Sequence, residues 1–168
     1  MIGLLEMHPL LNIDNITYRN INRKPVLDFS KIDSIAFQSG FTFLGQGRHR
    51  RTYLAPHARF VLKFPLNEYG ATANRQEHRL WHKFKNKPDP NNYNIIYAPC
   101  RLINSSILLM WAMISIGGDT NGDDSATDSG QVSRLESDEY PEWSDYVDAE
   151  QVGKLRNGKI AAYDFSIT

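Results

Sequence analysis

The sequence FTFLGQGRHRRTYLAPHARFVLK, residues 41–63, contains the pattern that decides the fold. Short apolar and β-branched segments alternate there with turn residues, which predicts three strands joined in sequence. The predicted strands are residues 41–44, 52–54 and 60–64. The first connection is a loop with Gly45 and Gly47, and Lys63 lies near the end of the third strand. We therefore expect an antiparallel meander that presents one lysine beside a glycine loop.

The rest of the chain adds one main helix, a shorter helix, two further strands and a C-terminal hairpin to this meander. Apolar residues recur at helical spacing over residues 71–84, and a shorter helix fits within residues 28–37. Residues 95–103 and 107–111 predict two more strands of the same sheet. An Asn157-Gly158 pair between two apolar-leaning runs predicts a C-terminal hairpin. The expected class is α+β, with a small antiparallel five-stranded sheet, one main helix and that hairpin.

The glycine loop and the lysine suggest a site for a phosphate group. Glycine lets a ligand approach the main chain closely, and exposed N–H groups in such a turn form an anion-binding concavity. Lys63, on a neighbouring strand, would supply the matching positive charge. The alternative is a plain β-meander in which Gly45 and Gly47 serve only the turn.

These residues resemble the nucleotide-binding lobe of protein kinases and kinase-like phosphotransferases. The family has a G-x-G-x-x-G loop followed by a strand with a lysine, and Gly45, Gly47 and Lys63 fall at the matching places. Arg50 stands where the third glycine is expected. More specifically, the chain is similar to small kinase-like proteins encoded by bacteriophages, in scattered blocks over residues 41–166.

The resemblance implies an ATP site with Mg²⁺ as its companion ion. Gly45, Gly47 and Lys63 would bind the phosphates, and the backbone at Met113 would meet the adenine ring. Glu77, in the middle of the main predicted helix, would orient Lys63. Glu68 is the second candidate for that role, in the connection before the helix.

The resemblance also implies metal-binding and catalytic residues in the C-terminal region. Asp164, in an Ala-Tyr-Asp stretch, and Gln151 would bind Mg²⁺. Asp148 and Asp145 are the candidate catalytic bases, although neither has the family's spacing to the amide residue, and no His-Arg-Asp motif is present. Ser166 replaces the glycine of Asp-Phe-Gly.

These departures favour a reduced, catalytically degenerate kinase-like protein that binds a partner protein, phage-encoded and acting in the host cytoplasm by resemblance. One alternative is an active small phosphotransferase. The other is a charge-driven module for nucleic acid or protein, using the basic tip at residues 48–51. Nucleic acid is the less favoured partner, because no aromatic residues interleave with these arginines.

The expected organisation is a single compact domain overall with four parts. They are a segment at 1–40 packing on the lobe, the lobe at 41–116, an acidic flexible linker at 117–140 and a remnant of the metal-binding hairpin at 141–168. Residues 1–101 carry 15 Lys and Arg against 7 Asp and Glu, while the remainder carries 4 against 12. This asymmetry indicates internal charge pairing or a polarised surface.

Two further features limit the expected environment. Cys100 is the single cysteine, so no internal disulfide can form, which fits a reducing cytoplasm. No run of apolar residues is long enough to predict a membrane span.

His78 and His82 have a spacing that can chelate a metal, but we interpret them as two solvent-facing side chains.

Overall fold

The computed structural model describes residues 8–85, 87, 96–115 and 152–163. The chain divides into two compact units. The first contains residues 1–75 and 101–109, and the second contains residues 76–100 and 110–168. We describe each unit by itself.

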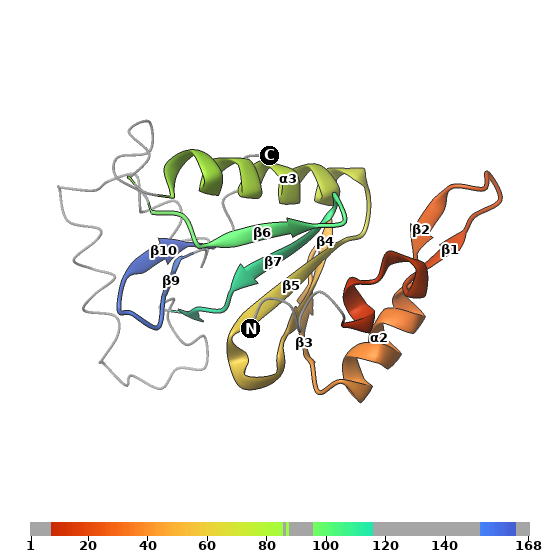
Figure 1. Ribbon diagram of the computed structural model, residues 1–168, viewed down its shortest axis with the longest axis horizontal. Coiled ribbons are helices and arrows are strands. Elements are labelled where there is room, and N and C mark those ends of the chain that lie inside the picture. Colours follow the sequence, from red (N-terminus) through yellow and green to blue (C-terminus); the bar gives the residue numbers. More distant parts are fainter. Residues whose placement is uncertain (1–7, 86, 88–95, 116–151, 164–168) are drawn as a thin grey trace. The chain divides into compact units, whose positions relative to one another are not determined.

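The main sheet confirms the predicted α+β class. Five strands follow one another in the order β3-β4-β5-β7-β6 (Figure 1). The strands are β3 (Thr42–Gln46), β4 (Arg50–Leu54), β5 (Phe60–Pro65), β6 (Cys100–Ile103) and β7 (Ile107–Trp111). The β3–β4 and β4–β5 pairs are antiparallel, and a 3-10 turn, η3 (Pro56–Ala58), joins β4 to β5. The glycines thus lie at the β3–β4 hairpin, as predicted, although Gly45 belongs to the strand itself.

Helix α2 (Phe29–Gln38) packs its apolar side into the core of the first unit. The Asp28 side chain caps the helix by accepting a hydrogen bond from the Lys31 backbone at 3.2 Å. Ile32 and Ala36, one turn apart, are buried. They share a core with residues of the sheet and of the 3-10 turn η1 (Pro9–Leu11). The fully buried members of this core include Leu10, Ile16, Ile32, Phe64 and Ile107.

A short antiparallel ribbon precedes α2 and was not predicted. Strand β1 (Thr17–Arg19) pairs with β2 (Pro25–Leu27), following the 3-10 turn η2 (Ile13–Asn15). Each strand has only three residues, too few for a clear alternation of apolar and polar positions. The signal that could have found it is Asn20, a turn-forming residue between two strand-forming triplets.

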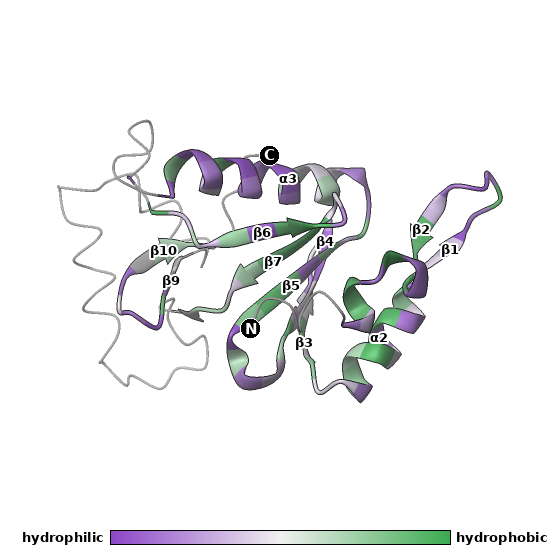
Figure 2. Ribbon diagram, viewed as in Figure 1, coloured by the Kyte–Doolittle hydropathy of each residue, from purple (hydrophilic) through white to green (hydrophobic). Residues whose placement is uncertain are grey.

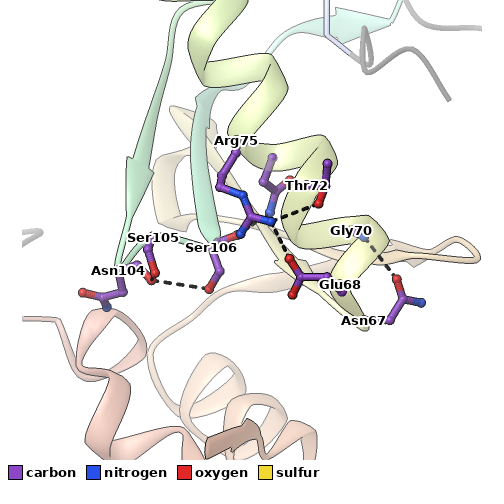
Figure 3. Close-up of polar contacts among 9 residues, drawn as sticks. Asn67, Glu68, Gly70, Thr72, Arg75, Asn104, Ser105 and Ser106 are labelled. Carbon is purple, nitrogen blue, oxygen red and sulfur yellow. Dashed lines mark hydrogen bonds and ion pairs between the residues drawn. The ribbon is translucent and has the colours of Figure 1, made fainter.

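Helix α3 (Glu68–Phe84) begins three residues before the predicted start at residue 71. Asn67 explains the difference, because its Oδ1 accepts a hydrogen bond from the Gly70 backbone at 3.1 Å and so begins the helix (Figure 3). Glu68 therefore lies in the first turn of α3, and its predicted place in a connection before the helix was wrong. An acidic residue there also suits the positive end of the helix dipole.

The second unit contains the predicted C-terminal hairpin. Strand β9 (Val152–Lys154) pairs with β10 (Ile160–Ala162), and Gly158 in the turn has φ of +83°. Only glycine adopts that angle without strain, which is why an Asn-Gly pair marks the turn. A further strand, β8 (Ile114–Ser115), extends this sheet in the order β10-β9-β8.

The predicted strand at residues 95–103 is shorter in the structure. Its regular part begins at Cys100, and before it the chain pairs with β10. The Ala98 N–H donates to the Ala162 carbonyl at 2.8 Å, and the Ala162 N–H donates to the Ile96 carbonyl at 2.9 Å. Within the described ranges, no helix has the length and apolar character needed to cross a membrane.

Candidate functional site

The register of the main sheet brings Gly45 and Lys63 into one cross-strand row. Gly45 of β3 pairs with Thr52 of β4, and Thr52 pairs with Lys63 of β5. Directly opposed residues of an antiparallel sheet point to the same face. The glycine and the lysine therefore lie on one face, separated by a single threonine. This places two of the predicted phosphate-binding residues together.

The opposite face of the same strands forms the core with α2. Tyr53, Leu62 and Phe64, which alternate with Thr52 and Lys63, are all nearly inaccessible to solvent. Burial on one face fixes the register, since a slip of one residue would exchange the two faces. The core thus holds Lys63 on the face away from α2.

Lys63 is buried, with 5% of its surface exposed. A charged ammonium group is seldom buried unless other groups compensate for its lost hydration. Most surface lysines, by contrast, keep the charged head in water. The burial of Lys63 therefore marks it as a residue with a defined role in this face of the sheet.

Neither Gly45 nor Gly47 is required by the local backbone or by packing. A Cβ atom at either position would meet no other atom within 4 Å, and neither residue has a positive φ. Gly47 closes the hairpin by donating its N–H to the Arg50 carbonyl at 2.9 Å, which any residue except proline can do. A glycine inside a strand weakens that strand unless a close approach requires it. The space next to Gly45 is therefore open to a ligand.

The hairpin tip is held in place by the start of α3. The His49 carbonyl accepts a hydrogen bond from the Leu66 backbone at 2.8 Å, and the His49 ring lies 3.2 Å from the Asn67 amide. Gly70 allows this approach, because a Cβ at that position would lie 2.1 Å from the His49 carbonyl oxygen. The glycine hairpin is consequently fixed to the helix that follows β5.

Asn74 was missed at the sequence level, although it organises this region. It is fully buried in α3, and its Nδ2 donates to the Lys63 carbonyl at 2.9 Å and to the Ser106 carbonyl at 2.7 Å. Its Oδ1 lies 3.5 Å from Nη1 of Arg50. A single amide thus joins α3 to β5 and to the β6–β7 turn. Nothing local in the sequence distinguishes this asparagine, since its partners are 11 and 32 residues away.

The structure distinguishes the two glutamates proposed to orient the lysine. Glu68 is exposed and forms an ion pair with Arg75, which also donates to Thr72 (Figure 3). Glu77 is fully buried. A buried carboxylate needs compensating partners, whereas a solvated ion pair contributes little. Glu77 is therefore the better candidate, and it belongs to the second unit.

The basic tip at residues 48–51 is not a row of free cations. Arg51 pairs with Asp33 of α2 at 2.9 Å, and its guanidinium lies 4.7 Å from the Phe43 ring centre. Arg50 is half-buried beside Asn74. Of the three arginines, only Arg48 is exposed. The proposed use of this tip as a polyanion-binding surface is thereby weakened.

The same Asp33 also accepts a hydrogen bond from the Tyr53 hydroxyl. Burial, with this hydrogen bond adding to it, raises the pKa of Tyr53 well above its ordinary value. The phenol therefore stays protonated and links β4 to α2.

The remaining predicted residues fall within the residue range of the second unit. Met113 is half-buried in the segment between β7 and β8. The four candidates for metal binding and catalysis lie outside the described residues: Asp145, Asp148, Gln151 and Asp164. In the part of the chain that the structure describes, no three His, Cys, Asp or Glu residues are grouped to hold a metal ion.

The histidine pair differs from its predicted state. The His78 and His82 rings lie 4.5 Å apart between centres, and His78 is half-buried, so only His82 is fully exposed. Burial, and secondly the neighbouring His82, lower the pKa of His78 below its ordinary value. The neutral imidazole is therefore favoured at position 78.

Comparisons with known proteins give matches among solved structures only. The sequence matches no protein-family model. It also matches no curated protein. Among solved structures, the chain is similar to the ternary complex of streptomycin, ATP and APH(2")-IIa, with 16% identity and a TM-score of 0.34. The match covers 54% of this chain and 31% of that one, so the chain spans about a third of the length of the solved protein.

Proposed function

We propose that this chain is a kinase-like protein that binds the phosphates of ATP on the sheet face carrying Gly45, Thr52 and Lys63. The observation that carries the proposal is the cross-strand row of these three residues. It combines a buried lysine with a glycine beside which a Cβ would meet no atom within 4 Å. Kinase-type lobes use a glycine hairpin, a lysine on the third strand and a glutamate on the following helix.

The positions of the two glycines are better explained by a bound ligand than by a requirement of the turn. If Gly45 and Gly47 served only the backbone, at least one would adopt a positive φ or lie against another atom. Neither does. A phosphate approaching the β3–β4 hairpin would use that open space, and the Lys63 ammonium would offset its charge.

We propose Glu77 as the carboxylate that orients Lys63. Kinase-type lobes take this glutamate from the helix that follows the lysine strand, and Glu77 lies in the middle of α3. Both Lys63 and Glu77 are buried, and a buried group of either sign is stable only when compensated.

The proposed role is non-catalytic binding of a partner protein in the cytoplasm, with Asp164 and Gln151 as the Mg²⁺ ligands. Arg50 in place of the third glycine and Ser166 in place of the glycine of Asp-Phe-Gly depart from the family pattern. Neither Asp145 nor Asp148 has the spacing of a catalytic base. A phage origin and a host protein as the partner are suggested by the sequence resemblance only.

The decisive experiment is a calorimetric titration of the full chain with ATP and Mg²⁺. Gly45→Val should abolish binding, because the new side chain fills the open space while a β-branched residue suits the strand. Gln46→Val is the matched control, since this neighbour pairs with Arg51 on the opposite face. It should bind like the wild type. Lys63→Met, which keeps the length and removes the charge, should also lose binding.

Each outcome separates the alternatives. Binding lost in Gly45→Val and Lys63→Met but kept in Gln46→Val supports the nucleotide site. Equal binding in all four folded proteins, or none in the wild type, overturns it. A subsequent assay of ATP turnover decides between the two kinase-like functions. Turnover that disappears in Asp164→Ala would establish an active phosphotransferase in place of the non-catalytic role.

A further inference from the structure

The β1–β2 ribbon is a separate surface feature of the first unit. Its strands pair in register from Thr17–Leu27 to Arg19–Pro25, and Figure 1 shows the ribbon extending from the end of the unit that carries α2. The turn is organised by Asn20, whose side chain accepts hydrogen bonds from the backbone of Asn22 at 3.1 Å and of Lys24 at 2.9 Å. The tip therefore has a defined shape.

The base of the ribbon is fixed to the core. Ile16 is fully buried, and its carbonyl accepts a hydrogen bond from the Asp28 backbone at 2.7 Å. The Thr17 hydroxyl donates to the Ile13 carbonyl at 2.8 Å, and Leu27 packs against the core. Because both strands are anchored where they leave the core, the ribbon is held at its base and is free only toward its tip.

The charged residues of the ribbon are all basic. Arg19, Arg23 and Lys24 are exposed, and none forms an ion pair with any residue that the structure describes. The sequence contains no Asp or Glu from Asn15 to Leu27. Figure 2 accordingly colours most of this turn as hydrophilic. Three unpaired cations on one short ribbon form a binding surface for a polyanion.

The tip also carries an exposed apolar residue, Ile21, with 98% of its surface exposed. It stands between Asn20 and Asn22, within two or three residues of every cation of the ribbon. No neighbouring side chain covers it, so the ribbon gains no stability from this apolar residue. An apolar side chain flanked by cations and amides matches the wedges that proteins insert between base steps of DNA.

We propose that the β1–β2 ribbon binds the minor groove of double-stranded DNA, with Ile21 inserted as a wedge and Arg19, Arg23 and Lys24 on the phosphates. Proteins that read DNA with β-ribbons place their strands in either groove, and minor-groove binders combine arginine, lysine and asparagine contacts with an inserted apolar wedge. The proposal does not depend on nucleotide binding at Lys63.

The composition of the tip favours DNA over a membrane or a single strand. An anionic bilayer would require Asn20 and Asn22 to enter the interface with Ile21, at a cost that one isoleucine does not offset. Binding of single strands relies on aromatic stacking platforms. Tyr18, the one aromatic residue of the ribbon, lies on β1 away from the tip.

The test uses the full chain and a short mixed-sequence DNA duplex carrying a fluorophore at each end. Anisotropy reports binding and energy transfer between the ends reports bending. Three phosphate contacts predict a slope of about −2.7 in log K against log salt, or about 40-fold weaker binding between about 50 and 200 mM salt. The variant Arg19→Ser/Arg23→Ser/Lys24→Ser should bind at least about tenfold more weakly and lose most of that slope.

The matched control is Arg79→Ser/Lys85→Ser/Lys87→Ser. It removes the same charge from three exposed positions in and just after α3. It should retain the affinity and the slope. Ile21→Ser should keep the slope but lose bending, and Ile21→Leu should restore bending.

Three results would overturn the proposal. The first is equal weakening by both triple variants, which would show binding by net charge alone. The second is bending that persists in Ile21→Ser. The third is absence of duplex binding by the wild type at the lower salt concentration, including the case in which only single strands, RNA duplexes or phosphatidylserine vesicles bind.

Discussion

Glycine has opposite meanings at two positions of this chain. At Gly45 a Cβ would meet no atom within 4 Å, whereas at Gly70 it would lie 2.1 Å from the His49 carbonyl oxygen. Close packing therefore requires glycine at position 70, whereas the protein leaves open space beside Gly45. The sequence presents the two residues identically, and only the fold separates them.

Replacement of Gly70 by alanine should destabilise the protein. In an exposed helix this change adds about 1 kcal/mol of stability. Here the new methyl group would displace the His49 carbonyl and its hydrogen bond from Leu66, so we expect a net loss of about 1–3 kcal/mol. Urea denaturation provides the measurement, with Gly47→Ala as the control that should change stability by less than about 0.5 kcal/mol. A stabilised Gly70→Ala variant would contradict the close approach.

The pKa of His78 gives the stability a pH dependence of known sign. Burial, and secondly His82, lower this pKa below 6.5, so the unfolded chain takes up a proton more readily than the folded chain. The contribution of His78 to stability is therefore full above pH 6.5 and is lost as the pH falls toward the folded pKa.

We expect the melting temperature to fall from about pH 7.5 to about pH 5.5, and His78→Gln to make this decrease smaller. His57→Gln, at an exposed position, is the control and should leave it unchanged. Calorimetry at these pH values is the measurement. A steeper decrease in His78→Gln would show that His78 affects the pH dependence of stability in the opposite direction. Some dependence should persist, because burial also lowers the pKa of His8.

At the level of elements, Asp33 connects α2 to the sheet. Its carboxylate accepts hydrogen bonds from the Tyr53 hydroxyl and from Arg51, whose guanidinium also stacks on Phe43. The network thus determines how α2 lies on β4. Arg51 Nε is buried and has no hydrogen-bond partner. The Arg51 guanidinium therefore depends on Asp33 for much of the hydrogen bonding that offsets its lost hydration.

Asp33→Ala should lower the free energy of unfolding by about 1–3 kcal/mol, since it leaves the Tyr53 hydroxyl and Arg51 without their acceptor. Asp33→Asn should lie between the wild type and alanine, because its amide oxygen still accepts one hydrogen bond. The exposed Asp14→Ala is the control and should change stability by less than about 0.5 kcal/mol. Denaturant midpoints would show the order, and equal stability of all four proteins would exclude a structural role for the network.

The elements that could be predicted are those whose signal is local. Apolar runs marked β5 and β7, and Asn157-Gly158 marked the β9–β10 hairpin because its turn geometry selects those residues. The start of α3 was misplaced because its first turn is signalled by a cap, Asn67, and not by apolar periodicity. Strand β1 was too short to show a period.

The candidate site was predictable only in part for the same reason. Gly45 and Lys63 are recognisable by type, but their shared row depends on strand register. Asn74 has no local signal, because its function lies in hydrogen bonds to Lys63 and Ser106 across the fold. The ion pair between Glu68 and Arg75 is likewise a property of the folded helix.

At the scale of the molecule, the two compact units share continuous elements. Helix α3 and strand β7 each begin in the first unit and end in the second. A helix or strand that unfolds in one unit loses its continuation in the other, and cooperative elements propagate such a loss. We therefore expect the chain to unfold in a single transition.

Asn74→Leu tests this coupling, because it acts on the first unit alone. It removes the donors to two carbonyls, those of Lys63 and Ser106, and should lower stability by about 2–4 kcal/mol. Trp81 and Trp111 lie in the second unit, so their fluorescence in a Trp143→Phe background reports on that unit. Far-ultraviolet circular dichroism reports on both units. If the units unfold together, Asn74→Leu lowers the fluorescence midpoint and the dichroism midpoint equally. A fluorescence midpoint that stays in place while the dichroism transition divides in two would show that the first unit unfolds independently.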